Sequence, residues 1–284
     1  MKLGFLMPLT LETIATAKYL GYDSIEVGAG WLGTTMDGLE KNQAQLKEAL
    51  QENAIRISSI AVYGGTITTP VAEAVAYWAR AIKLTRTFDC NVVSGLTGRD
   101  NTLSVDQNLP LFKERFEPIA QIAADHGVRI AFEPWPGGIQ GHGPYRWTNL
   151  ATTPEVWDKL FNTVQNTSLG LEYDPSHLYW QEIDYVRVIR EYGNRIYHLH
   201  AKDIVIDKAK LGHCGVHGTG WWRFVIPGLG VLDWAAIFAA LIDAKYAGDM
   251  AVEHEDGAYM NEKWNEGLTI GLKTLRPFVQ AFNG

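Results

Sequence analysis

Four residues of the chain have side chains that commonly bind divalent metal ions, and each stands near the end of a strand-like segment. They are Glu133 in RIAFEPW, Asp174 in LGLEYDPSH, His200 in IYHLHAKD and Glu253 in MAVEHED. Three carboxylates and one imidazole form an oxygen-rich ligand set, which suits Mn²⁺ best and Mg²⁺ or Co²⁺ as alternatives. We therefore expect a site for one divalent ion.

The spacing of these four residues fits strands of one parallel sheet. Successive candidates are separated by 41, 26 and 53 residues, and each interval accommodates a helix and loops between parallel strands. A buried cluster of ion pairs is the alternative explanation. Three carboxylates around one imidazole would repel one another strongly without a cation, so the metal site is favoured.

Short strand-like segments alternate with longer helical patterns from end to end, as in repeated βα units around a parallel sheet. We expect strands at 2–6, 24–27, 56–60, 91–94, 129–133, 169–174, 196–200 and 250–253. We expect helices near 10–20, 37–53, 71–88, 108–126, 153–165, 182–192, 233–244 and 262–280. This alternation predicts an α/β fold, a (β/α)₈ TIM barrel that spans residues 1–284 as a single domain.

An open doubly wound sheet is the alternative architecture. It would be expected to carry a glycine-rich dinucleotide-binding loop after its first strand. Here the first strand is followed by MPLTLET, so the closed barrel is favoured. The carboxyl ends of barrel strands converge on one rim, which would bring the four metal candidates together.

Two long loops, 134–152 and 204–232, are expected to follow the fifth and seventh strands. Long loops at this end of a barrel commonly recognise the substrate. The first loop carries Trp135 and His142, and the second carries Arg223. The chain has ten tryptophans, and because indole rings pack well against the apolar faces of sugars, we expect a carbohydrate pocket.

Composition and charge exclude several classes of function. The chain has 25 basic and 32 acidic residues, a net charge of −7, so it offers no basic surface for nucleic acid. The apolar stretch at the N-terminus is too short for a secretory signal, so we expect none. The chain has no uninterrupted apolar stretch of about 18 residues, so we expect no membrane span. Cys90 and Cys214 are too few for a disulfide framework. These features predict a cytoplasmic protein with a small-molecule substrate.

The segments FEPW, DPSH, HLHAKD, PGLGVLDW and VEHED, in this order, resemble the xylose-isomerase-like family of sugar isomerases and epimerases. That family includes sugar phosphate isomerases/epimerases, ketose 3-epimerases and inosose dehydratases. The resemblance covers essentially the whole barrel and implies metal ligands at the four positions named above. It also implies that Glu133 and Glu253 are the acid/base pair on opposite faces of the substrate. His177 would contact the metal-bound substrate or its water, and Asp203 would orient its neighbours at the substrate site.

Such a site predicts proton transfer next to a sugar carbonyl. A divalent ion polarises the carbonyl, a carboxylate removes the neighbouring proton, and the metal stabilises the resulting enediolate. Reprotonation of the enediolate gives an isomerase or epimerase, which is the first choice. Loss of a leaving group would instead give a lyase or dehydratase acting on a keto-sugar, an inosose or a 3-keto-glycoside, which is the alternative.

Other candidate residues are assigned by their type and position. His142 could serve as an additional base, particularly in a lyase, although a solvated loop histidine is the simpler explanation. Lys202 and Arg223 could hold a substrate hydroxyl or a phosphate, and Trp135 could pack against a sugar ring. The sequence has no clustered phosphate-binding signal, so a non-phosphorylated sugar or glycoside is expected.

Two further classes of protein compete with the sugar enzyme. The same superfamily contains endonucleases that cut at abasic sites with three zinc ions, but these need histidines on early strands, and the first histidine here is His126. A non-catalytic sugar sensor or subunit would be expected to have lost at least one ligand. Because members of the family often form dimers or tetramers, a homo-oligomer or an accessory subunit is compatible with the resemblance.

Overall fold

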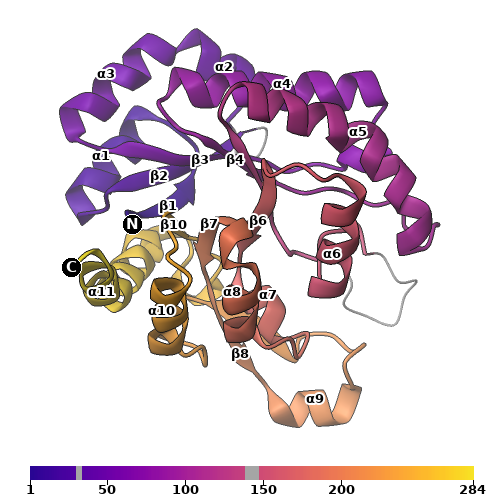
Figure 1. The fold of residues 1–284 in the computed structure, drawn as a ribbon. Coiled ribbons are helices and arrows are strands. Elements are labelled where there is room, and N and C mark those ends of the chain that lie inside the picture. The colour runs from indigo at the N-terminus through magenta and orange to yellow at the C-terminus, as the bar shows by residue number, and fades with distance from the viewer. Residues whose placement is uncertain (30–33, 138–146) are drawn as a thin grey trace.

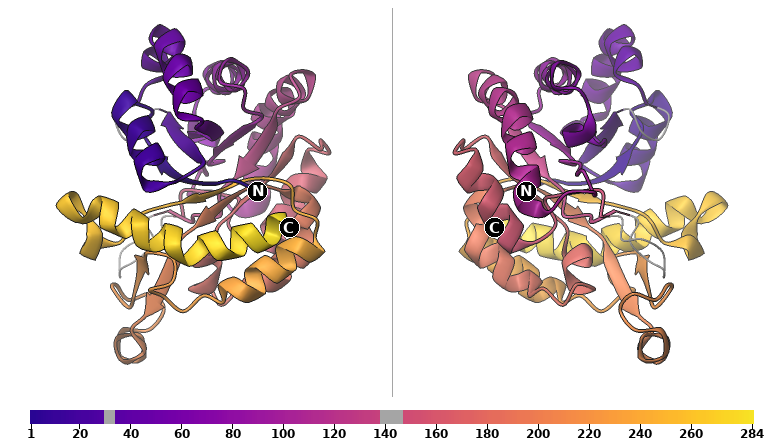
Figure 2. Two further views of the ribbon diagram at one scale, coloured as in Figure 1. Left: turned by 90° about the vertical axis from the view of Figure 1, so that its left-hand side faces the viewer. Right: turned by 90° about the vertical axis from the view of Figure 1, so that its right-hand side faces the viewer.

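The computed structural model describes residues 1–29, 34–137 and 147–284 of the chain. Eight parallel strands close into a barrel in the order β1-β10-β7-β6-β5-β4-β3-β2, with helices packed around the outside (Figures 1 and 2). The strands are β1 (Leu3–Met7), β2 (Ser24–Ala29), β3 (Arg56–Val62), β4 (Val92–Gly95), β5 (Arg129–Phe132), β6 (Leu169–Tyr173), β7 (Ile196–Ala201) and β10 (Met250–Val252). The predicted (β/α)₈ barrel is confirmed.

The barrel closes because β1 pairs with both β2 and β10. Its strands are buried along nearly their whole length, as expected for strands with side chains packed inside and helices packed outside. Ile25, Ile60, Val93 and Ile130 have no exposed surface. Because neighbouring strands run parallel, their carboxyl ends lie at the same rim of the barrel.

Several helices begin at a residue whose side chain accepts a hydrogen bond from the first helical turn. The α-helices of the described residues are α1 (Leu11–Leu20), α2 (Met36–Lys41), α3 (Gln43–Asn53), α4 (Val71–Thr87), α5 (Val105–Asp125), α6 (Pro154–Thr163), α7 (Pro175–Tyr179), α8 (Tyr185–Tyr192), α9 (Lys208–Cys214), α10 (Trp234–Asp243) and α11 (Trp264–Asn283). Short 3₁₀-helices are η1 (Thr66–Thr68), η2 (Gly193–Arg195), η3 (Gly257–Tyr259) and η4 (Asn261–Lys263). Ser104 and Gln107 form a capping box at the start of α5. The predicted helix 37–53 is divided at Asn42, where the backbone leaves helical geometry.

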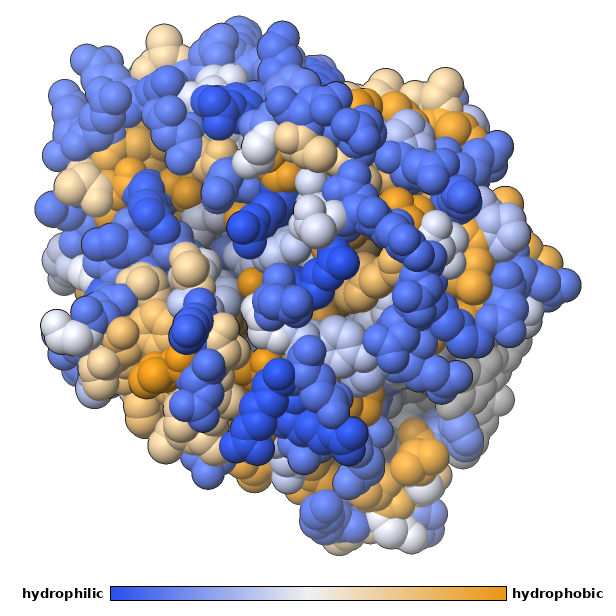
Figure 3. All heavy atoms as spheres, in the orientation of Figure 1, coloured by the Kyte–Doolittle hydropathy of each residue, from blue (hydrophilic) through white to orange (hydrophobic). Residues whose placement is uncertain are grey.

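The outer helical layer presents mainly polar residues to water. Figure 3 shows a face dominated by hydrophilic side chains, with apolar residues gathered in smaller patches between them. This pattern is typical of amphipathic helices whose apolar stripe faces a sheet. None of the helices in the described part of the chain is long and apolar enough to cross a membrane.

The segment 204–232 is more ordered than the loop that we expected. Strand β8 (Asp203–Ile206) pairs antiparallel with strand β9 (Trp222–Val225), and α9 connects them. This β8–β9 hairpin projects from the barrel, with α9 at its far end (Figures 1 and 2). The short apolar runs DIVI and WRFV are rich in residues that favour strands, so these two strands could have been predicted from the sequence.

The side chain of Asp203 anchors the base of this hairpin to the barrel. It is fully buried, and each of its carboxylate oxygens accepts two hydrogen bonds. The donors are Ile204 N, Gly228 N, Leu232 N and Trp234 Nε1, at 2.9 to 3.1 Å. A side chain at Gly230 would collide with the same carboxylate. The role at the substrate site that the resemblance implied for Asp203 stays a prediction, and its hydrogen bonds fasten the following loop to the barrel.

We expect Asp203→Ala to destabilise the fold by on the order of 3 kcal/mol or more, because four N–H groups lose their acceptor and three of these hydrogen bonds are buried. Urea denaturation measures this free energy of unfolding. Asp233 is a matched control, since it is exposed and caps α10 by accepting a hydrogen bond from Ala236 N. Asp233→Ala should cost about 1 kcal/mol. Equal losses in the two variants would contradict the anchoring role of Asp203.

Candidate functional site

The four predicted metal ligands meet at the carboxyl end of the barrel. Glu133 directly follows β5, Asp174 follows β6, Glu253 follows β10, and His200 lies within β7. These strands are neighbours in the order β10-β7-β6-β5. One candidate ligand atom from each residue lies within 4.8 Å of the others, and all four residues are buried. Their role as metal ligands stays a prediction, but the geometry that it requires is present.

Two buried polar atoms of this cluster make no hydrogen bond. One is His200 Nδ1, which lies 3.0 Å from Glu253 Oε2 and 3.4 Å from Glu133 Oε1. The other is Asp174 Oδ2, whereas Asp174 Oδ1 accepts hydrogen bonds from Ser176 N and Oγ at 2.8 and 2.7 Å. Buried polar atoms without such partners are costly. A divalent ion bound among the carboxylates would satisfy both, so the residues present fit a metal.

Nearby cations hold the carboxylates in their charged form. Burial opposes the ionisation of Glu253, yet Lys202 and His200 lower its pKa below the usual range. Burial and the charge of Glu253 also oppose the ionisation of Glu133. His177 and His200 nevertheless lower the pKa of Glu133 below its usual value. In return, the carboxylates raise the pKa of His200 well above its usual value despite burial. Metal binding displaces protons from its ligands, so an ion would replace a proton on this imidazole.

Lys202 is a second cation built into the site. Its side chain is almost completely buried, and Nζ lies 2.6 Å from Glu253 Oε2, 3.1 Å from Glu255 Oε2 and 3.3 Å from Asp174 Oδ2. Nζ also lies 3.1 Å from His177 Nε2. Although burial opposes its charge, these carboxylates raise the pKa of Lys202 well above its usual value. An ammonium group and a divalent ion together would offset most of the surrounding negative charge, so both can be present.

A cavity of about 450 Å³ opens beside the cluster. Its volume falls in the range of small-molecule sites. The lining residues are Tyr63, Gly64, Gly65, Leu96, Glu133, Trp135, Thr148, His177, Lys202, Glu253 and Glu255. The structure therefore places three of the predicted substrate contacts, Trp135, His177 and Lys202, in the wall of one cavity. Tyr63 and Glu255 are wall residues that sequence reasoning missed.

The β8–β9 hairpin supports one side of this cavity. The Phe224 ring lies 5.1 Å from the ring of His177, edge to face, and Lys202 Nζ lies 4.4 Å from its centroid. A cation over an aromatic face is stabilised by the ring quadrupole. Arg223, a predicted substrate contact on the same strand, is exposed and forms an ion pair with Asp256 at 3.2 Å, outside the cavity wall. His142, the predicted additional base, lies outside the described residues.

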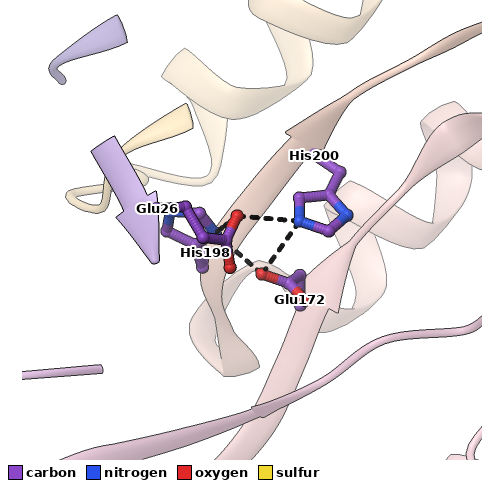
Figure 4. A group of neighbouring side chains, drawn as sticks. All are labelled: Glu26, Glu172, His198 and His200. Atoms are coloured by element: carbon purple, nitrogen blue, oxygen red, sulfur yellow. Dashed lines mark hydrogen bonds and ion pairs between the residues drawn. The ribbon is translucent and has the colours of Figure 1, made fainter. Parts of the chain in front are cut away.

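A second buried group lies deeper in the barrel and was not anticipated. Glu26, Glu172 and His198 join His200 in it, and all four side chains are fully buried (Figure 4). Residues two apart on a strand face the same side. Glu172 precedes Asp174 by two positions and His198 precedes His200 by two, so this periodicity could have placed both inside the barrel. The signal for Glu26 was weaker: one carboxylate within the apolar strand SIEVGA.

The two carboxyl groups of this deeper group differ in charge. Burial and the neighbouring Glu26 raise the pKa of Glu172 well above its usual range. Burial acts in the same direction on Glu26, but His198 and His200 lower its pKa to about 2. These surroundings favour the charged form of Glu26 beside His200 and the neutral form of Glu172.

Residues 14–277 match the family model of the xylose isomerase-like TIM barrel, so the chain belongs to this family. Among curated proteins, the inosose dehydratase of Clostridium botulinum (strain Alaska E43 / Type E3) is 24% identical over 246 residues, which cover 80% of this chain and 78% of that protein. Among solved structures, the IolI protein with a bound zinc atom has a TM-score of 0.76 and 20% identity, covering 99% of both chains. A D-psicose 3-epimerase in the presence of D-fructose has a TM-score of 0.74 and 18% identity, covering 98% of this chain and 99% of that one.

We expect the protein to bind one divalent ion per chain, and Asp174→Asn to weaken this binding by at least about tenfold, because it removes a charged ligand. Isothermal titration with Mn²⁺ and with Zn²⁺ measures the affinity. The amide keeps an oxygen that can accept from Ser176 N, so the stability of the metal-free variant should change little. Unchanged affinity in a folded variant would exclude Asp174 from the ligand set.

Proposed function

We propose that the protein is a divalent-metal-dependent lyase, a dehydratase that removes a proton next to the carbonyl of a sugar-like ketone and eliminates water. The observation that carries this proposal is the four-ligand cluster beside a cavity of sugar size. Similarity to an inosose dehydratase over 80% of the chain supports elimination. The isomerase or epimerase favoured from the sequence shares the same first step, so it is the second candidate.

The first step requires a base beside the substrate carbonyl. When bound, a divalent ion would supply Lewis-acid polarisation of that carbonyl. Glu133 and Glu253 both line the cavity and are both ionised, so either carboxylate can accept the neighbouring proton. Both also belong to the proposed ligand set, which holds their oxygens close to the reacting carbon.

The second step requires a proton donor for the departing hydroxyl group. Lys202 and His177 both line the cavity, and Lys202 Nζ lies 3.1 Å from His177 Nε2. The electron pair left by the abstracted proton forms the carbon–carbon double bond as the carbon–oxygen bond breaks. The hydroxyl leaves as water with a proton from Lys202 or His177, so one proton is taken and one is given. Glu255, 3.1 Å from Nζ, can return a proton to this pair.

The proposed reaction is tested with a panel of inososes, ketoses and 3-keto-glycosides, incubated with the protein and Mn²⁺ in deuterated water. We expect loss of one water from an inosose or related keto-polyol, detected by mass spectrometry and by absorbance of the conjugated product. Deuterium incorporation at one carbon without loss of water would instead establish the epimerase or isomerase. No exchange and no product with any of these substrates would contradict both.

We expect Glu133→Gln and Glu253→Gln each to lower turnover by at least about 100-fold, since an amide cannot accept the substrate proton. Steady-state rates at saturating metal separate this effect from weaker metal binding. Glu114→Gln is a suitable control, because Glu114 is exposed on α5 and lies outside the cavity wall. Near-normal rates in both cavity variants would count against proton abstraction by either carboxylate.

A further inference from the structure

The deeper group of Glu26, Glu172, His198 and His200 is joined by direct polar contacts (Figure 4). His200 Nε2 lies 2.8 Å from Glu26 Oε2, and His198 Nδ1 lies 2.8 Å from Glu172 Oε1. Both nitrogen–oxygen distances are those of hydrogen bonds. Because His200 also belongs to the candidate metal cluster, the deeper group is physically connected to the proposed metal site.

A second metal ion is a poor explanation for this group. Ligands held tetrahedrally at about 2.1 Å around one ion lie roughly 3.4 Å apart. The two histidine–glutamate pairs are closer, at 2.8 Å. His198 Nε2 has a further partner in Ser58 Oγ at 3.1 Å. These contacts describe a hydrogen-bonded network rather than a set of ligands awaiting a cation.

The network fixes which nitrogen of His200 carries a proton. The hydroxyl of Ser94 donates to Glu26 Oε1 at 2.6 Å, and Ser94 Oγ lies 2.7 Å from Ser59 Oγ. Ser94 therefore holds the Glu26 carboxyl group in place through Oε1, and Oε2 faces His200 Nε2 as the acceptor. His200 Nε2 must be the donor in this pair. In a neutral imidazole the other nitrogen, Nδ1, then presents its lone pair.

Nδ1 is the atom that faces the candidate metal ligands. It lies 3.0 Å from Glu253 Oε2 and 3.4 Å from Glu133 Oε1, and it makes no hydrogen bond. We propose that Glu26 is a positioning residue, which holds His200 in the tautomer and orientation that direct Nδ1 at the metal. This inference rests on the proposed metal site. It assigns a role in that site to β2, which contributes none of the four candidate ligands.

The contact also spans the barrel. Glu26 lies on β2, which is separated from β7 by β1 and β10 in the closed sheet. Outer hydrogen-bond partners of metal-bound histidines set ligand orientation and basicity. Through Glu26 and Ser94, strands from the amino-terminal half of the barrel would tune the affinity of a site whose ligands all come from the carboxyl-terminal half.

The test compares the Mn²⁺ affinities of the wild type, Glu26→Ala and Glu26→Gln by isothermal titration. Glu26→Ala should weaken binding by about 10- to 100-fold, the usual effect of losing such a partner. Glu26→Gln should restore most of the affinity, because its amide oxygen can accept from His200 Nε2 while its amide nitrogen faces Ser94. Glu172→Gln is the matched control. It replaces an equally buried residue whose Oε1 lies 2.8 Å from His198 Nδ1 but 3.4 Å from His200 Nε2, beyond good hydrogen-bond distance, so it should leave affinity within about threefold.

The outcomes separate this inference from the proposed metal site. If the wild type binds no divalent ion, the metal site itself fails. If the wild type and Glu26→Ala bind equally well, the metal site stands and the positioning role of Glu26 is overturned. A loss of Mn²⁺ affinity in Glu26→Gln as large as in Glu26→Ala would also overturn it, because a hydrogen-bond acceptor alone should suffice.

Thermal melting of each metal-free variant shows whether any loss of affinity comes from unfolding. If Glu26→Ala does not fold, Glu26→Gln is compared with Glu26→Asn, whose shorter amide cannot reach His200. Weaker Mn²⁺ binding by Glu26→Asn supports the positioning role, and equal binding overturns it.

Discussion

Repulsion among closely placed carboxylates is the constraint on which the candidate site depends. Glu133, Asp174 and Glu253 present oxygens within 4.8 Å of one another at buried positions. Like charges at such distances interact strongly when water is excluded. The chain offsets part of this charge with Lys202 and with the proton on His200. The remaining negative charge and the atoms without hydrogen bonds are the physical reason why a divalent cation fits.

The barrel holds these closely placed carboxylates in position by fixing the chain segment next to them. The segment that leaves β7 passes through Lys202 and is fixed at Asp203, whose carboxylate accepts four hydrogen bonds. The hairpin that follows brings Phe224 against the Lys202 ammonium group. Groups at strand ends are positioned more precisely than groups in free loops. A buried ammonium among carboxylates can therefore stay at one position instead of moving to solvent.

The sequence predicted the features that follow from local residue patterns. It did not predict the contacts that form only when the barrel closes. Alternating strands and helices predicted the barrel, and ligand-type residues at strand ends marked Glu133, Asp174, His200 and Glu253 as candidate ligands, which the structure brings together. The contact between Glu26 and His200 joins positions 174 residues apart on non-adjacent strands, so no local pattern could reveal it. The anchoring role of Asp203 was hidden for a similar reason, because three of its four donors, Gly228, Leu232 and Trp234, lie 25 to 31 residues further along the chain.

The unequal surroundings of the two candidate bases bear on the choice between elimination and epimerisation. Glu253 lies 2.6 Å from the Lys202 ammonium group, whereas Glu133 faces the imidazoles of His177 and His200 at 3.4 Å. An epimerase needs two carboxylates of similar competence on opposite faces of the substrate. A carboxylate in direct contact with an ammonium group is a weaker base. Glu133 is therefore the stronger of the two candidate bases, and Lys202 places a proton donor beside Glu253, an asymmetry that suits loss of water better than inversion of a carbon.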